Sequence, residues 1–166
     1  MSKVKGKRVG KKKSDRRWRD PDGKVWASRF EWTVYDTLSR LGCNVRKCTE
    51  RDSISYSEPK PNVKCMECGS LQCMQERIYT PDLFLIPKGR GNGDGYFIET
   101  KGYFARDKRI LFRCFRNDRQ DIDLRLILES DHWTTKGKTR LSQYAERYLP
   151  NTPCHVWNGD IPDDWK

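Results

Sequence analysis

The sequence has few histidines, no long apolar run and no secretory signal. The only histidines among the 166 residues are His132 and His155, so the sequence does not favour a catalytic mechanism based on histidine. No apolar run reaches the roughly 18 residues of a membrane span, and the charged N-terminus lacks the apolar segment of a signal peptide. From these absences we expect a soluble intracellular protein without a membrane partner.

Disulfide bonds are also not expected. The chain has seven cysteines, an odd number, and no secretory signal accompanies them. This usage fits a reducing compartment such as the cytoplasm better than a disulfide framework.

Charge divides the chain into a tail and one domain. Residues 1–19 contain ten Lys or Arg and one Asp, so they carry +9 of the formal net charge of +11. Such a block is predicted to be disordered and suits binding to a polyanion, whereas a solubilising arm or a nuclear-localisation signal is the alternative. Residues 20–166 have the length of one compact domain.

Residues 79–101 have the pattern of a β-hairpin. Two apolar, aromatic-rich runs flank a glycine-rich loop, which predicts antiparallel strands with a long connection. Because strand side chains alternate between faces, Glu99 and Lys101 are expected on one face. Asp82 begins the first strand, and antiparallel pairing can place it beside Glu99.

Two carboxylates and a lysine in one place suit metal-assisted hydrolysis of a phosphodiester. Asp82 and Glu99 would supply oxygen ligands to Mg²⁺ or Mn²⁺, which leaves positions for water and a substrate phosphate. Lys101 would orient or help to deprotonate the attacking water and offset the charge that develops at phosphorus. The alternative is a surface hairpin with solvated charges.

The order Pro-Asp followed by Glu-x-Lys resembles the motif of restriction-endonuclease-like nucleases. Residues 79–82 (Tyr-Thr-Pro-Asp) and 99–102 (Glu-Thr-Lys-Gly) are more closely similar to endonuclease I of the T-odd phages, a family of four-way DNA junction resolvases. A helix opening at residues 28–31 and a closing Ile-Pro-Asp-Asp-Trp at residues 161–165 follow the family's order and approximate spacing. The resemblance covers nearly the whole chain after the tail.

The resemblance implies a fold, an activity and a partner. The fold would be α/β, a restriction-endonuclease-like mixed sheet flanked by helices, in a homodimer that exchanges strands. The activity would be Mg²⁺-dependent cleavage of Holliday junctions and other branched DNA, in the cytoplasm of a phage-infected bacterium. Glu31 would join Asp82 and Glu99 at the metal, although a capping box with Ser28 alone would justify a glutamate there.

Several Lys and Arg residues are candidates for phosphate contacts. Some lie in the tail, others on a predicted amphipathic helix over residues 103–118, and others in a predicted loop over residues 130–140. They are Lys11, Lys12, Lys13, Arg16, Arg17, Lys108, Arg109, Lys136 and Lys138. For the helix we predict an apolar face of Ile110, Leu111, Cys114 and Phe115, with the arginines facing solvent.

The insertion at residues 65–73 departs from the family pattern and contains a possible zinc site. Cys65 and Cys68 have Cys-x-x-Cys spacing, and Cys73 could add a third thiolate. Cys48, Cys43, a partner chain's cysteine or water could complete a structural site. Free thiols are the alternative.

Residues 57–64 contain two prolines, which exclude a central strand and favour a stiff, extended connector or a surface loop. The resemblance would make this connector the bridge between exchanged halves. We further predict a helix from Ser28 to Gly42, an edge strand within residues 45–54, and a buried strand over residues 124–128. A short helix over residues 141–148 and a last strand at residues 155–157 complete the expected elements.

Two other functions fit the same residues. One is a homing or restriction-type nuclease that reads a sequence. The other is a non-catalytic, zinc-containing DNA-binding protein on a nuclease scaffold, against which intact Asp82, Glu99 and Lys101 argue.

Overall fold

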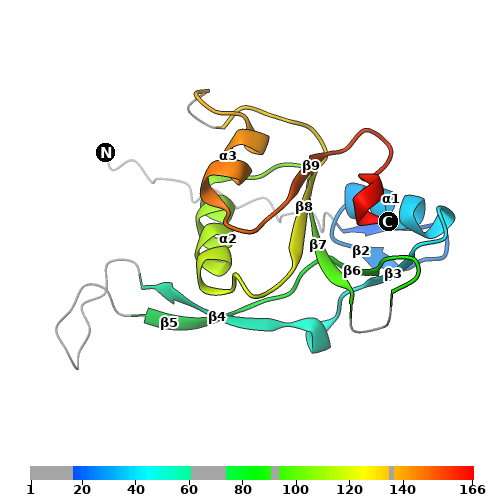
Figure 1. The fold of residues 1–166 in the computed structure, drawn as a ribbon, viewed down its shortest axis with the longest axis horizontal. Helices are drawn as coiled ribbons and strands as arrows, with labels where there is room; N and C mark the ends of the chain where they lie inside the picture. The colour runs from blue at the N-terminus through cyan, green and yellow to red at the C-terminus, as the bar shows by residue number, and fades with distance from the viewer. Residues whose placement is uncertain (1–16, 61–73, 91–93, 135–136) are drawn as a thin grey trace, which may run out of the picture.

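The protein is a mixed α/β structure built on a five-stranded sheet. The computed structural model describes residues 17–60, 74–90, 94–134 and 137–166. The sheet has the order β3-β6-β7-β8-β9 (Figure 1). Its strands are β3 (Asn44–Lys47), β6 (Leu83–Ile86), β7 (Tyr96–Lys101), β8 (Leu124–Leu128) and β9 (Cys154–Val156). β3, β6 and β7 pair antiparallel, whereas β7, β8 and β9 pair parallel. The predicted α/β class with a mixed sheet is therefore confirmed.

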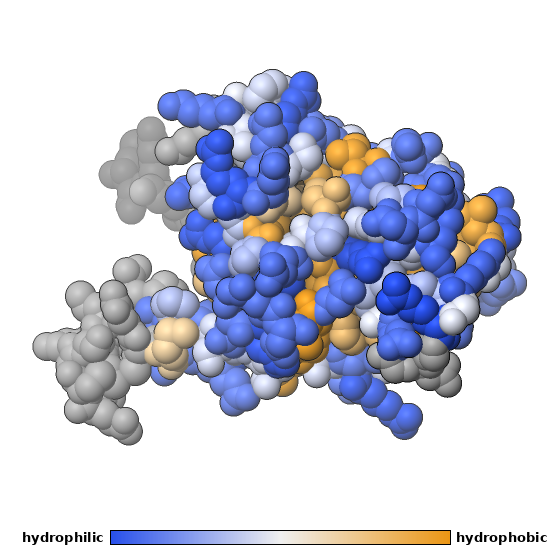
Figure 2. Space-filling model, in the orientation of Figure 1, coloured by the Kyte–Doolittle hydropathy of each residue, from blue (hydrophilic) through white to orange (hydrophobic). Residues whose placement is uncertain are grey.

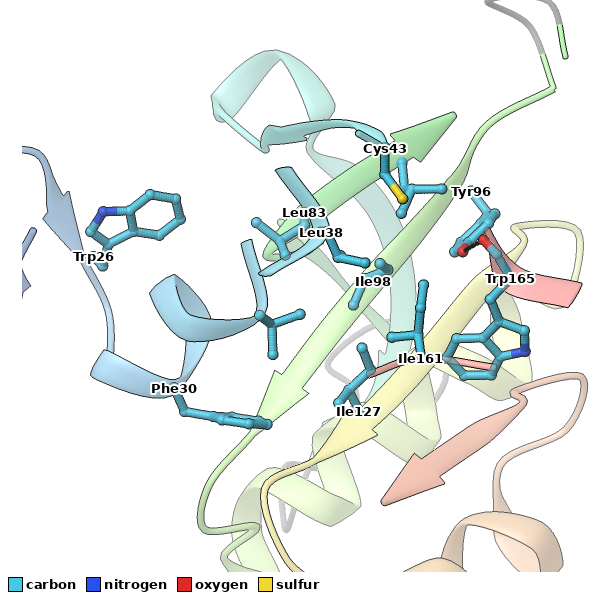
Figure 3. Packing of buried hydrophobic residues seen from close by; sticks show 12 residues of the cluster. Trp26, Phe30, Leu38, Cys43, Leu83, Tyr96, Ile98, Ile127, Ile161 and Trp165 are labelled. Atoms are coloured by element: carbon cyan, nitrogen blue, oxygen red, sulfur yellow. Dashed lines mark hydrogen bonds between the residues drawn. The ribbon is translucent and has the colours of Figure 1, made fainter. Parts of the chain in front are cut away.

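Helices cover both faces of this sheet. Helix α1 (Arg29–Arg40) packs on one face, and α2 (Arg106–Asp118) and α3 (Leu141–Tyr148) lie on the other (Figure 1). Between α1 and the sheet, Phe30, Leu38, Ile98 and Ile127 belong to one buried cluster, which the C-terminal Trp165 also joins (Figure 3). A second cluster fills the space beneath α2 and α3. Side chains that alternate along β7 and β8 supply both cores.

Local signals set the ends of α1 as predicted. The Ser28 side chain accepts a hydrogen bond from the Glu31 backbone amide at 3.0 Å, which satisfies one of the amides that a helix leaves unpaired at its start. Gly42 follows the helix with φ of 73°, a conformation that glycine adopts without strain. The N-terminal residues of α1 are therefore held in one place, and Glu31 is among them.

The predicted hairpin of β6 and β7 is present, with Leu83 opposite Ile98. Ile98 contributes to the core beneath α1, and its neighbour Phe97 packs against the core beneath α2. Glu99 and Lys101 lie two and four residues after Phe97, so they are on the same face of β7 as Phe97, as the alternation predicts. The predicted edge strand over residues 45–54 is confirmed in part, because β3 lies at one end of the sheet but ends at Lys47, and residues 50–52 form a 3₁₀ helix.

The proline-containing region differs from the expected free connector. β4 (Ile54–Pro59) pairs along its whole length with β5 (Met74–Tyr79) in a separate two-stranded sheet, which extends beyond the central sheet in Figure 1. Tyr56 of β4 packs edge-on against Phe115 of α2, with ring centroids 5.4 Å apart. Pro59 is the last residue of β4, where its missing amide costs least. The rest of the connector, apart from Lys60, lies outside the described residues.

The predicted faces of α2 are partly wrong. Phe115 is buried as predicted, but Ile110 and Leu111 are 42% and 38% exposed, and Phe112 and Arg116 are buried instead. The Arg116 guanidinium donates to Thr152 Oγ1 at 2.8 Å, and to the carbonyl oxygens of Ile122 and Asn151 at 3.0 and 2.9 Å. An arginine can occupy this core because backbone oxygens receive its N–H groups.

The remaining expected elements are present, and further short ones occur. β8, α3 and β9 match the predicted strand, helix and last strand, although β9 begins one residue earlier. Additional elements are β1 (Trp18–Arg19), β2 (Val25–Trp26) and two short 3₁₀ helices, η1 (Glu50–Asp52) and η2 (Asp163–Trp165). Among the described residues, no helix is both long and apolar enough to cross a membrane.

Candidate active site

The structure brings Glu31, Asp82, Glu99 and Lys101 to one end of the β6–β7 hairpin. Glu31 comes from the first turn of α1, Asp82 directly precedes β6, and Glu99 and Lys101 belong to β7. Because Leu83 pairs with Ile98, the next antiparallel position outward sets Asp82 opposite Glu99. Electrostatic coupling between Asp82 and each of the other three side chains also indicates that the group is close together.

Asp82 is held against β7 by two short hydrogen bonds. Its Oδ2 atom accepts from the Thr100 backbone amide and from Thr100 Oγ1, both at 2.7 Å. The Asp82 carbonyl oxygen also accepts from the Cys48 amide at 3.0 Å, which ties it to the strand region after β3. The carboxylate is therefore fixed beside the residue that separates Glu99 from Lys101.

Glu99 is a buried carboxyl group with one oxygen unsatisfied by the described residues. Glu99 is 2% exposed, and its Oε1 atom accepts a hydrogen bond from the Lys101 ammonium group. Oε2 is buried and has no hydrogen-bond partner among the described residues. Burial, followed by the nearby charge of Asp82, raises the pKa of Glu99 to about 7, although Lys101 opposes the shift. An unpartnered oxygen on such a group is an available ligand for a cation.

Lys101 is the charged partner of this carboxylate. Its side chain is 24% exposed, so the ammonium group can meet solvent or a substrate. Burial acts to lower the pKa of Lys101, but the charges of Glu99, Asp82 and Glu31 outweigh it, and the net pKa is raised. Lys101 is therefore a cation at neutral pH, which suits charge neutralisation and water orientation better than proton abstraction.

Glu31 has two tasks at the same place. Its Oε2 atom accepts a hydrogen bond from the Ala27 amide at 2.8 Å, one residue before the Ser28 amide that a capping box would use, and Oε1 lies 3.5 Å from Lys47 Nζ. Burial first, and then the Asp82 charge, raises the pKa of Glu31. Glu31 therefore both holds the chain just before α1 and lies near Asp82.

Sequence reasoning missed three side chains of the site. Thr100 anchors Asp82, and Lys47 pairs with Glu31. Tyr79 carries a buried hydroxyl that, like Glu99 Oε2, has no hydrogen-bond partner among the described residues, and its nearness to Glu99 acts to lower the carboxyl pKa against the larger effect of burial. The Tyr79 ring stacks on Phe115 with centroids 4.2 Å apart. Thr100 could have been found, because it lies within the Glu-x-Lys motif. Lys47 and Tyr79 reach the site through tertiary contacts, which a local sequence pattern cannot predict.

The donor set fits Mg²⁺ chemically. Carboxylate oxygens are the ligands that this ion prefers, and the buried Glu99 Oε2 has no other partner among the described residues. Asp82 and Glu99 would hold the ion, with Glu31 as a third acid. Among the described residues, no group of three or more His, Cys, Asp or Glu side chains is arranged to hold a metal ion.

The predicted zinc ligands fall mainly outside the described residues. Cys65, Cys68 and Cys73 belong to that undescribed segment, so their role stays a prediction. Cys48 is described, and it is 7% exposed with a free thiol. Burial raises the pKa of Cys48 to about 12, which favours the neutral thiol over the thiolate that binds zinc.

The predicted phosphate contacts divide into three groups. Lys11, Lys12, Lys13, Arg16 and Lys136 lie outside the described residues. Arg17, Lys108 and Lys138 are exposed. Arg109 is 7% exposed and its Nη1 atom donates to the Phe104 carbonyl oxygen at 2.6 Å. The predicted solvent position of Arg109 is therefore wrong, because its guanidinium fills a packed position between α2 and the preceding loop.

Comparisons with protein-family models, with curated proteins and with solved structures found no significant match to this chain. The resemblance to endonuclease I, with the function and homodimer that it implies, therefore stays a prediction from the motifs.

Proposed function

We propose that the protein is a Mg²⁺-dependent, structure-selective DNA endonuclease that hydrolyses phosphodiesters in four-way junctions and other branched DNA. The observation that carries the proposal is the meeting of Asp82, Glu99 and Lys101 at one end of a hairpin, with Glu99 Oε2 buried and unpartnered among the described residues. A solvated surface hairpin would leave such a carboxylate in water.

The residues divide the chemical work as follows. Mg²⁺, when bound, supplies Lewis-acid activation of water and of the phosphate. Asp82 and Glu99 hold the cation, and Thr100 keeps Asp82 in place. Lys101 stays protonated beside Glu99, orients the attacking water and neutralises charge at phosphorus. Glu31 completes the acidic group while its side chain accepts a hydrogen bond from the Ala27 amide just before α1.

Selectivity for branches and the homodimer rest on the resemblance. The restriction-endonuclease-like arrangement is supported by the mixed sheet and by the position of the motif on β6 and β7. Strand exchange is compatible with the chain order, because α1, β3 and β4 precede residues 61–73 and β5 to β9 follow them. An exchange at that point would preserve the site while Glu31 and Asp82 came from different chains.

A cleavage assay tests the proposal. Four-way junctions with random-sequence arms and matched linear duplexes are incubated with the protein, in Mg²⁺ and in EDTA. We expect Mg²⁺-dependent cuts near the branch and little cutting of the duplexes. Cuts at one defined sequence in linear DNA would instead identify a sequence-reading nuclease, and binding without cleavage would identify a non-catalytic protein.

A further inference from the structure

A basic groove of about 390 Å³ lies between α2, α3 and the loop that follows β8. Three arginines that line it, Arg106, Arg109 and Arg113, come from α2, and Lys138 comes from the loop. No Asp or Glu is among the described residues that line it. Hydrophilic side chains predominate over α2 and α3 in Figure 2.

The helix geometry explains why the arginines meet. Positions 106, 109 and 113 are separated by three and four residues, so they lie on one face of α2. Arg109 forms the floor, since its guanidinium lies 5.4 Å from the Tyr144 ring and the Tyr144 hydroxyl donates to its carbonyl oxygen at 3.3 Å. Arg106 and Lys138 are exposed, and Arg113 is half-buried. The groove therefore has accessible cationic side chains above the buried Arg109.

Other arginines in the described part of the protein have a carboxylate that neutralises them. Arg119 pairs with Asp121 at 2.8 Å, and Arg46 pairs with Asp52 at 2.6 Å. Within the described parts of the chain, Arg106, Arg113 and Lys138 have no carboxylate in salt-bridge contact. Like charges gathered without counter-charges favour binding of an anion.

The groove begins close to the candidate active site. The Phe104 ring lies 6.0 Å from Lys101 Nζ, and the Phe104 carbonyl accepts the hydrogen bond from Arg109. Tyr144 and Tyr148, with ring centroids 5.1 Å apart, line the opposite side and offer flat surfaces to a sugar or a base. The same strand-to-helix connection thus joins the catalytic lysine to the groove.

We propose that this groove is a second phosphate-binding site, which holds the backbone of a DNA strand away from the cleaved bond. Arg106, Arg113 and Lys138 contact the phosphates, and Arg109 positions them from below. The inference rests on the proposed function for the identity of the polyanion as DNA. It adds a specific surface that the cleavage motif does not require.

Binding without cleavage tests this site. The full chain and its Arg106→Ala, Arg113→Ala and Lys138→Ala variants are titrated in EDTA against a labelled four-way junction and a linear duplex, at several salt concentrations. Each lost phosphate contact should reduce the slope of log affinity against log salt by about 0.9 and weaken binding several-fold. Lys88→Ala is the control, because Lys88 is an exposed lysine on the loop after β6 that does not line the groove.

A second readout does not depend on mutation. Lysine acetylation of the wild-type chain, followed by mass spectrometry, should show that DNA protects Lys138 and leaves Lys88 reactive. Unchanged salt slopes in the three groove variants, equal losses in Lys88→Ala, or unprotected Lys138 would each overturn the groove proposal. If the groove variants lose affinity but the wild type cleaves no branched DNA in Mg²⁺, the groove stands and the proposed activity falls.

Discussion

Asp82 and Thr100 form a two-point contact in which one carboxylate oxygen accepts from both the amide and the hydroxyl of the same residue, each at 2.7 Å. The contact joins the residue before β6 to the part of β7 between Glu99 and Lys101. It fixes the carboxylate of a residue that lies outside any strand, as the proposed metal site requires.

Thr100→Val tests this contact. The variant keeps the backbone donor but loses the hydroxyl, so Asp82 gains freedom and cleavage should fall about 10-fold to 100-fold, as is typical when a metal ligand loses its support. Thr100→Ser, which retains the hydroxyl, should stay near wild type. Single-turnover rates over a range of Mg²⁺ concentrations provide the measurement, and equal rates for Val and wild type would show that the hydroxyl is dispensable.

Glu99 should make the metal-free protein less stable as pH rises through neutrality. Its pKa is raised from 4.5 to about 7 on folding, so the folded state holds the proton more tightly than the unfolded state does. The stabilising contribution is complete below about pH 4.5 and is lost as pH rises through about 7. Asp52, whose pKa is lowered to about 2, stays ionised in this window.

Urea unfolding in EDTA between pH 5 and 8 measures this effect. The wild-type free energy of unfolding should fall by on the order of 2–3 kcal/mol across the window, at about 1.4 kcal/mol for each pKa unit. Glu99→Gln should flatten the dependence, while both histidines remain in the variant. An equally steep dependence in Glu99→Gln would assign the effect to another group.

Arg116 should be a major contributor to stability. Its guanidinium is fully buried and serves Thr152 and several carbonyl oxygens around the β8 and β9 ends. Arg116→Met should cost roughly 3–5 kcal/mol, because the buried oxygens lose their donors. Lys108→Met, on the exposed side of α2, should change the urea midpoint little. A small effect of Arg116→Met would mean that water replaces the guanidinium.

Mixed mutants test strand exchange. Glu31→Gln and Asp82→Asn chains are refolded together, and heterodimers are isolated with two different affinity tags. If chains exchange, one site in the heterodimer carries both lesions and the other carries neither, so nicking of one junction strand should return. If isolated heterodimers stay inactive like each parent, both acids of a site belong to one chain.

The strands and helices that were predictable follow from local patterns. The Ser28 cap, Gly42 and the two apolar runs around the hairpin loop each determine an element through their immediate neighbours. The faces of α2 were not predictable in this way. Arg116 is buried because carbonyl oxygens from residues 119–122 and 150–151 converge on it, and these oxygens meet only in the folded chain.

The candidate site shows the same division. Glu99, Lys101 and Asp82 could be associated through strand alternation and antiparallel pairing. The partnership of Glu31 with Lys47, and the buried hydroxyl of Tyr79 near Glu99, arise from contacts between α1, β3, β5 and β7. Such contacts between distant elements cannot be predicted from the spacing of residues in the sequence.

The most direct test of the central claim is single-turnover cleavage of a random-sequence four-way junction in Mg²⁺ by the wild type, Glu99→Gln and Lys101→Ala, with binding measured in parallel. Lys88→Ala, at an exposed lysine with no proposed role, serves as the control for an uninvolved cation. The account predicts cleavage by the wild type and the control, and loss of orders of magnitude in rate by the two site variants, with junction binding retained. Near-native cleavage by Glu99→Gln or Lys101→Ala would contradict it.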